Sequence, residues 1–143
     1  MFVLQQDPID VTKARNSHSA LDNGALLSFE GIVRGDILKD NWVRSLLYIA
    51  DAPACLAEGE KIIKEALVSF PVNDIVCIQR TGPINTGETA VWIGVWAPHR
   101  DEAFKACRFV IEEIKKRLRI WKKEFLNNGS SLWVYGTGTP VVQ

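Results

Sequence analysis

Residues 89–118 read TAVWIGVWAPHRDEAFKACRFVIEEIKKRL. The first part, Thr89 to Ala97, is almost entirely apolar, which is typical of a central strand buried on both faces. From Asp101 to about Leu118, apolar residues recur at helical spacing, which predicts a long amphipathic helix. A buried strand that leads directly into such a helix predicts a sheet with helices packed against it.

The segments on either side predict further strands and helices. Asp7-Pro8 predicts the start of a short helix that runs to about Ser17, and Pro53 predicts a helix that runs to about Phe70. Residues 35–41 are predicted to form a loop, and residues 81–88 are rich in turn-forming residues. Extended runs rich in β-branched and aromatic residues predict strands at 2–5, 24–35, 42–50, 73–81 and 132–135. Because helices and strands do not alternate regularly, we predict an α+β fold with helices on one side of a mostly antiparallel sheet.

Composition limits the classes of protein to which the chain can belong. It has 143 residues, so we expect one domain over residues 1–143. The 17 basic and 17 acidic residues balance, which gives no reason to expect nucleic acid as a partner. No apolar run reaches the roughly 18 residues of a membrane span, and MFVLQQDPID has no basic segment before an apolar stretch, so we expect no signal peptide. The cysteines show no metal-binding spacing, so we expect three buried thiols in a reducing cytoplasm (Cys55, Cys77 and Cys107).

Two groups of basic residues lie at the ends of apolar strands. Arg34 closes the run SFEGIVR, in which Gly31 predicts a bulge or a close approach of neighbouring backbone. The pair His99-Arg100 opens the long helix, where free N–H groups and a partial positive charge favour anions. The alternatives are a solvated arginine at a strand end, and a surface helix start that is capped by Asp101.

A third basic group surrounds the tryptophan of RIWKKE. For Lys116 and Lys123 we expect a solvated helix face. Lys115 lies four residues after Ile111, so it shares a face with apolar residues and either snorkels to solvent or lines a pocket. Crowding by Lys122 and Arg34, with partial burial, would lower the pKa of Lys115 so that it exchanges protons near neutral pH. While protonated, the same lysine would stabilise a developing oxyanion instead.

The length of the helix limits how these residues can act together. Arg100 and Lys115 are 15 residues apart, which corresponds to about 22 Å along a helix. They cannot reach one small molecule within one chain. If both serve one site, that site is shared between two subunits of a two-fold dimer, which then contains two such sites.

Six segments, in this order, give the chain a resemblance to a known family: GALLSFEGIVRG, EGEKIIKEA, QRTGPINTGETAV, APHRDEAFKAC, EEIKKRLRIWKKE and SLWV. Over about Gly24 to Val134 the chain resembles the molybdopterin synthase large subunit family. The resemblance implies an α/β hammerhead fold with an additional antiparallel sheet. It implies a homodimer of large subunits with a ubiquitin-like small subunit at each end, together a heterotetramer.

The resemblance also implies a reaction. The small subunit carries a C-terminal thiocarboxylate, whose sulfur passes in two rounds to cyclic pyranopterin monophosphate (precursor Z) and forms the dithiolene of molybdopterin. No metal and no bound cofactor are expected. The family's catalytic lysines match Lys115 and Lys122. Its substrate-binding residues match four further positions, two of them supplied by the neighbouring subunit: Phe29 and Arg34, and from the neighbour His99 and Arg100.

The chain departs from the family pattern at three places. Gln79 stands where the family usually has histidine, in a strand that we expect to be structural. Arg119 replaces a proline, and the segment YIADAPACLAEGE at residues 48–60 differs from its usual version, which would alter small-subunit docking.

Two other functions stay open on the sequence alone. One is a degenerate family member that keeps the fold and the dimer without activity. The other is a binding module that holds nucleic acid or an anionic surface with a basic helix, KKRLRIWKKEF. The zero net charge and the acidic residues within and beside this run (Glu112, Glu113 and Glu124) argue against the module.

Overall fold

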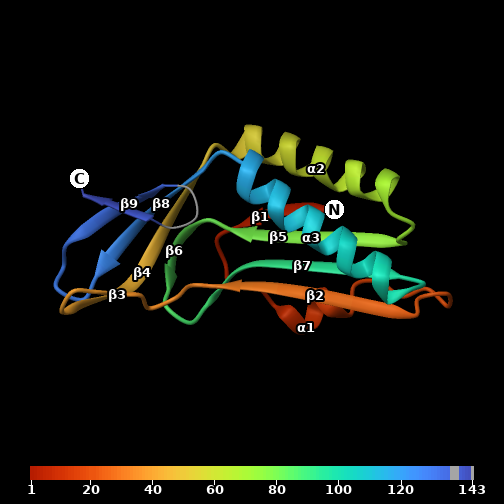
Figure 1. Ribbon diagram of the computed structural model, residues 1–143, viewed down its shortest axis with the longest axis horizontal. Helices are drawn as coiled ribbons and strands as arrows, with labels where there is room; N and C mark the ends of the chain where they lie inside the picture. The colour runs from red at the N-terminus through yellow and green to blue at the C-terminus, as the bar shows by residue number, and fades with distance from the viewer. Residues whose placement is uncertain (136–138, 143) are drawn as a thin grey trace.

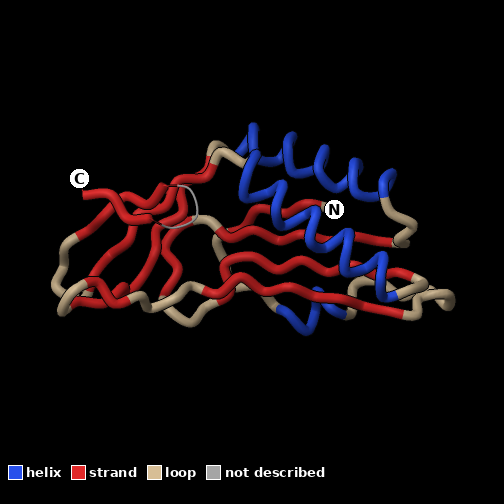
Figure 2. Tube along the Cα trace, in the orientation of Figure 1, coloured by secondary structure: helices blue, strands red, loops and turns tan. Residues whose placement is uncertain are grey.

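Two β-sheets lie end to end along the long axis of the molecule (Figure 1). The computed structural model describes residues 1–135 and 139–142, with side chains up to Val134. Helices gather over one of the sheets, whereas strands and short loops make up the other end (Figure 2). The predicted α+β class is confirmed.

The first sheet has four strands in the order β1-β5-β7-β2. β1 and β5 are parallel, and the other two pairings are antiparallel. The central strand β7 is buried along almost its whole length, as its apolar sequence predicted. The strands of this sheet are β1 (Phe2–Gln5), β2 (Ala25–Ile32), β5 (Asp74–Arg80) and β7 (Thr89–Ala97).

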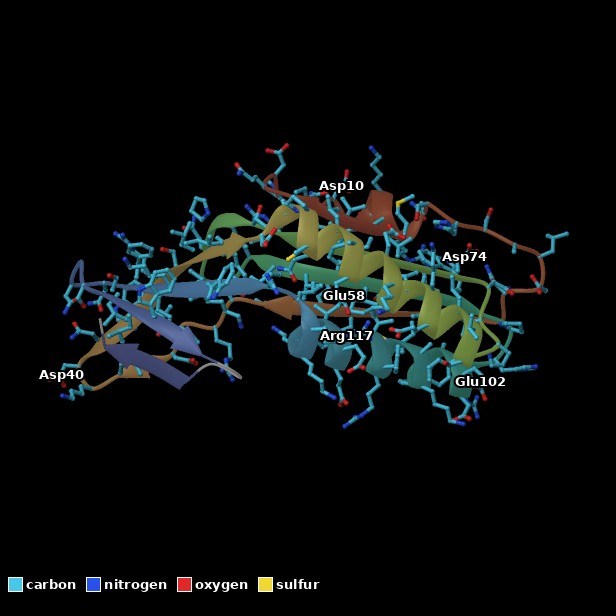
Figure 3. All side chains as sticks on the ribbon, turned by 90° about the horizontal axis from the view of Figure 1, so that it is seen from above. Asp10, Asp40, Glu58, Asp74, Glu102 and Arg117 are labelled. Atoms are coloured by element: carbon cyan, nitrogen blue, oxygen red, sulfur yellow. The ribbon has the colours of Figure 1, made fainter. Side chains whose placement is uncertain are left out.

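Two long helices, α2 (Ala52–Ser69) and α3 (Arg100–Arg117), cover one face of this sheet. Their apolar residues face the sheet because they recur at helical spacing, and together they form the main core. Arg117 of α3 also joins the two helices through ion pairs of 2.6 Å to Glu58 and to Glu65 of α2. Figure 3 shows Glu58 and Arg117 beside each other, with Glu102 far along α3 from Arg117. The three cysteines are free and buried, as predicted.

The short helix α1 (Val11–Arg15) lies on the opposite face of the sheet, where Ala14 packs against Trp92 and Trp96. The prediction that it starts at Asp7-Pro8 is wrong. Asp10 is the N-cap, and its side chain accepts a hydrogen bond from the backbone N–H of Lys13. The carbonyl groups of Asp7 and Pro8 instead accept hydrogen bonds from the Gln5 side chain, so no helical turn begins there.

The second sheet is entirely antiparallel, with the path β10-β9-β8-β4-β3 and β6 paired to β4. Two of its strands lie where the sequence predicted only loop and turn. Residues 35–41 contain β3. The chain turns at Lys39, whose φ is 58°, and β4 then returns beside β3. Residues 81–88 contain β6, which β4 also pairs. The strands are β3 (Ile37–Leu38), β4 (Asn41–Ala50), β6 (Gly82–Asn85), β8 (Ile120–Leu126), β9 (Ser131–Tyr135) and β10 (Thr139–Val142).

The run KKRLRIWKKEF, a single basic helix in the binding-module alternative, is a helix end followed by a strand, and the predicted end of the long helix at about Leu118 is confirmed. α3 ends at Arg117, because Leu118 is extended with φ −76° and ψ 139°, and β8 begins at Ile120. Successive side chains of a strand point to opposite faces, so Lys122 and Lys123 diverge. Lys123 lies 5.3 Å from the centre of the Trp133 ring rather than on a solvated helix face. Lys116 is exposed on α3 beside Glu113, as expected.

Candidate active site

A cavity of about 190 Å³ lies where the two sheets meet. Its wall combines the end of β2, the end of α3 and the inner face of the second sheet. Its lining combines charged and polar residues with apolar ones. The lining residues are Gly31, Ile32, Val33, Arg34, Asp36, Leu46, Tyr48, Gln79, Ala90, Val91, Lys115, Lys122, Glu124 and Val134. We call this cavity the junction pocket.

Gly31 turns β2 towards the junction pocket. The pairing of β2 with β7 shifts between Gly31 and Ile32, which marks a bulge. A Cβ atom on Gly31 would lie 2.6 Å from Cγ1 of Val91, so a larger residue would push the strands apart. Both features were predicted from the glycine. The chain then brings Arg34 to the pocket lining, where its Nε lies 3.5 Å from Oδ1 of Asp36, although 74% of its side-chain surface is exposed, as the alternative of a solvated arginine expects.

Lys115 and Lys122 enter the junction pocket from different elements. Lys115 stands on the last turn of α3 and lines the pocket, but it is exposed, so the expectation that it is partly buried is wrong. Lys122 comes from β8 and is partly buried opposite Tyr48 of β4. Burial, then the positive charges of Lys115 and Arg34, lower the pKa of Lys122 to about 8. The sequence predicted a lowered pKa for Lys115. Lys122 is the more buried of the two lysines, because it lies on β8 within the second sheet.

Sequence reasoning missed the acidic and aromatic part of the pocket. Glu124, with 6% of its surface exposed, follows Lys122 on the same face of β8. Burial and the nearby carboxylate of Asp36 raise its pKa, against the opposing charges of Lys122 and Arg34. Its Oε2 has no hydrogen-bond partner among the described residues. The period-two spacing of Lys122 and Glu124 would have indicated it, had 120–126 been recognised as a strand.

Gln79 also contributes to the pocket wall. Its amide donates hydrogen bonds to the carbonyl groups of Arg80, at 2.9 Å, and of Ala90, at 3.3 Å. The strand is structural, as expected, because β5 pairs on both sides. The side chain nevertheless lies at the candidate site, so this departure from the family pattern is closer to the chemistry than the sequence suggested.

His99 and Arg100 lie at the other end of α3, in a shallow surface pocket with Gly24, Pro98 and Asp101. His99 is the N-cap residue, although its side chain makes no capping hydrogen bond. The alternative that Asp101 caps the helix is wrong, because Asp101 lies within the first turn and pairs with Lys105 at 3.0 Å. The structure therefore brings Arg34, Lys115 and Lys122 together but leaves His99 and Arg100 apart from them.

Phe29 borders the junction pocket without lining it. Its ring lies 3.6 Å from the position of a Cβ atom on Gly31, and 38% of its surface is exposed. The ring faces a groove between β2 and α3 that Phe104 and Ile111 also line. β2 is the edge strand of its sheet, so this groove lies at an open border of the described fold.

Residues 1–135 and 139–142 contain neither a membrane-spanning helix nor a group of side chains suited to a metal ion. No helix among them is long and apolar enough to span a membrane. No group of three or more histidine, cysteine, aspartate and glutamate side chains among them could hold a metal ion. The junction pocket combines three basic side chains with a buried carboxyl group, a composition that suits an anionic ligand.

Comparison with known proteins gives a consistent family. The family described as "MoaE protein" matches residues 4–117. A molybdopterin synthase catalytic subunit from Pyrococcus abyssi is 34% identical over 94% of this chain and 90% of its own length. One from Synechococcus elongatus is 41% identical over 79% of this chain and 68% of its own. The crystal structure of molybdopterin synthase from Staphylococcus aureus superposes with a TM-score of 0.86 and 31% identity, covering 94% of this chain and 96% of that one.

The fold and the match over most of the chain define a member of the MoaE protein family, and this chain belongs to it. Its relatives are catalytic subunits of molybdopterin synthase, so its role is in molybdopterin synthesis. The resemblance drawn from the six sequence segments is confirmed.

Proposed function

We propose that the chain is the catalytic subunit of a molybdopterin synthase and acts as a sulfurtransferase. It takes sulfur from the C-terminal thiocarboxylate of a small ubiquitin-like subunit and transfers it, in two rounds, to cyclic pyranopterin monophosphate, precursor Z. The convergence of Arg34, Lys115 and Lys122 on one pocket carries the proposal, because both substrates are anions. The whole chain acts as one large-subunit domain in the cytoplasm, without a metal or bound cofactor.

The junction pocket suits the charge changes of this reaction. The thiocarboxylate sulfur attacks an electrophilic, oxygen-bearing carbon of the pterin; a C–S bond forms as the C–O bond at that carbon breaks, and the oxygen leaves with the electron pair and takes a proton. Water then attacks the carbonyl carbon, the acyl C–S bond breaks, and the small subunit leaves as a carboxylate. Lys115 orients the incoming tail and assists proton transfer, and Lys122 neutralises the developing charge. Since each round consumes one thiocarboxylate, the spent small subunit must leave before the second round.

A second copy of the chain completes the site in this proposal. The two ends of α3 are about 22 Å apart, so His99 and Arg100 reach the substrate only from a neighbouring subunit. The open border at β2 supports such a neighbour, because Ile32 and Phe104 are both more than half exposed there. Arg34 and the neighbour's arginine then hold the cyclic phosphate. A small subunit at each end completes a heterotetramer.

The test is a single-turnover assay with purified chain, thiocarboxylated small subunit and precursor Z. Wild type and Lys116→Ala should form molybdopterin, since Lys116 is exposed and pairs with Glu113 outside the pocket. Lys115→Ala should form none while remaining dimeric. A wild-type chain that binds the small subunit tightly but forms no product would establish the degenerate, non-catalytic alternative. Attention would then turn to the unusual 48–60 segment.

The nucleic-acid-binding alternative loses its main support. The basic run is divided between α3 and β8, so its lysines do not share one surface. Lys122 faces the pocket, Lys123 faces Trp133, and Lys116 faces solvent. If binding of nucleic acid to the chain does not weaken steeply as the salt concentration rises, the nucleic-acid-binding alternative is excluded.

A further inference from the structure

Lys122 and Tyr48 are direct partners in the ladder between β8 and β4. Residues in register on neighbouring strands project from the same face, so both side chains enter the junction pocket. The Nζ of Lys122 lies 5.7 Å from the centre of the Tyr48 ring. This is within the range of a cation–π interaction, which favours the charged form of lysine.

The ring of Tyr48, rather than its hydroxyl group, is the part suited to this role. Only 8% of the residue surface is exposed, and burial raises the pKa of Tyr48 to about 12. The phenol therefore stays neutral throughout the working pH range and exchanges no proton with Lys122. The electron-rich face of the ring remains available to the ammonium group whatever the pH.

Glu124 supplies a second support from the same strand. It stands two residues after Lys122, on the pocket side of β8, and is almost completely buried. One carboxyl oxygen lacks a hydrogen-bond partner among the described residues, although burying such an atom costs free energy. Among the described residues this carboxyl group makes no ion pair with Lys122, so it acts on the lysine through its charge at a distance, in the direction that favours the ammonium form.

Four charged residues and one aromatic ring influence the charge of Lys122. Lys115 of α3 and Arg34 after β2 both oppose its protonation. Asp36 pairs with Arg34 at 3.5 Å, which leaves Glu124 as the carboxyl group that favours the Lys122 ammonium. The ring of Tyr48 acts in the same direction. Two cations thus compete with one carboxyl group and one ring for the charge state of a single lysine.

We propose that Tyr48 and Glu124 are positioning residues for Lys122: the ring of Tyr48 holds its ammonium group over the junction pocket, and the charge of Glu124 helps to keep it protonated while Lys115 and Arg34 repel it. The inference rests on the proposed function for its role in catalysis. The contacts themselves do not depend on that function. Neither residue needs to touch the substrate, since each acts through the lysine.

The test is a site-resolved titration of Lys122 in the full chain, with lysine carrying ¹³C at the ε carbon. The Lys122 signal is identified by its absence from Lys122→Arg. Tyr48→Phe, which keeps the ring, should retain the wild-type midpoint. Tyr48→Leu, which removes the ring, should lower the midpoint by roughly half a pH unit. Glu124→Gln should also lower it, whereas Asp40→Asn should not, because Asp40 is exposed at the far end of the same sheet (Figure 3).

Equal midpoints for Tyr48→Leu and Tyr48→Phe, or for Glu124→Gln and Asp40→Asn, would overturn the inference. If Tyr48→Leu does not fold, the Glu124→Gln comparison decides alone. The titration uses no substrate, so it stands or fails separately from the sulfur-transfer proposal. If turnover is observed, its alkaline limb should move to lower pH in the same order as the midpoints. A limb that stays fixed while the midpoints move would overturn the positioning role.

Discussion

The two ends of α3 carry basic residues in opposite settings. At the C-terminal end, Lys115 meets Arg34 and the partly buried Lys122 in a cavity, where crowding changes the chemistry of a side chain. At the N-terminal end, His99 and Arg100 are exposed in a shallow surface pocket. One end is a walled pocket within the chain, which we propose as the reaction site. The other has the residues for binding an anion but lacks walls, which a second subunit would supply.

This difference shows what a single chain can and cannot provide. At the C-terminal end, burial and repulsion among the cations lower the pKa of Lys122 to about 8, and the buried charge costs stability below that pH. The exposed residues at the N-terminal end cost little stability, and in the proposed function they act only after assembly with a second subunit. Stability, pH dependence and subunit mixing should therefore distinguish the two ends.

The largest effects are expected from Lys115→Ala and Arg100→Ala, each of which should slow product formation by about 100-fold or more. Mixing the two inactive variants should restore about a quarter of wild-type activity, since half of the dimers are mixed and each mixed dimer has one intact site. Single-turnover assays before and after subunit exchange measure this recovery. Failure to recover activity, with exchange demonstrated, would place both residues in separate sites.

The pH dependence of the wild type should come next in size. The pKa of Lys122 is lowered to about 8, so the lysine is mostly protonated at neutral pH and loses its charge as the pH rises through that value. If the ammonium form is required, turnover should fall by about 10-fold from pH 7 to pH 9. Lys122→Arg should move this limb to higher pH. An unchanged limb in that variant would exclude Lys122 as its source.

Lys122→Met should stabilise the fold while it impairs the reaction. The pKa of Lys122 is about 8 in the folded chain and 10.5 as its ordinary value. Below pH 8 both states bind the proton, so the native state bears the full cost of the buried charge. Between about pH 8 and 10.5 the native lysine deprotonates and the cost disappears. After allowance for solvent screening, the gain at pH 7 should be about 1–2 kcal/mol and shrink above pH 8, as measured by urea unfolding.

His99→Ala should have the smallest effect on stability, within about 0.5 kcal/mol of wild type. The residue occupies the N-cap position, but its side chain makes no capping hydrogen bond that could be lost. Urea unfolding of this variant beside Lys122→Met compares the two ends of α3 directly. If His99→Ala lowers the free energy of unfolding as much as removing an N-cap hydrogen bond does, the His99 side chain stabilises the helix.

The parts of the fold that depend on local pattern were predictable. The apolar run 89–97 and the helical spacing after Asp101 predicted β7 and α3 because each pattern repeats over many residues. Gly31 predicted both the bulge and the close approach to Val91. β3 and β6 were missed because short strands depend on their partner β4, which lies distant in sequence from β6.

The site was predictable in its cations and not in the residues around them. Basic residues stand out beside apolar strands, so Arg34, Lys115 and Lys122 were found. Tyr48 and Glu124 reach the pocket through the register of β4 with β8, which no single segment encodes. Interpreting 120–126 as part of a helix also hid the opposite directions of neighbouring lysines.

Side chains along β8 alternate between the two faces of the sheet, and this restricts the length of the link between α3 and β8. Inserting or deleting one codon between Leu118 and Trp121 would rotate every later side chain of the strand to the other face. Lys123 would then enter the pocket, while Lys122 and Glu124 would turn outward. We therefore expect related chains that retain the reaction to differ in the length of this link only by even numbers of residues.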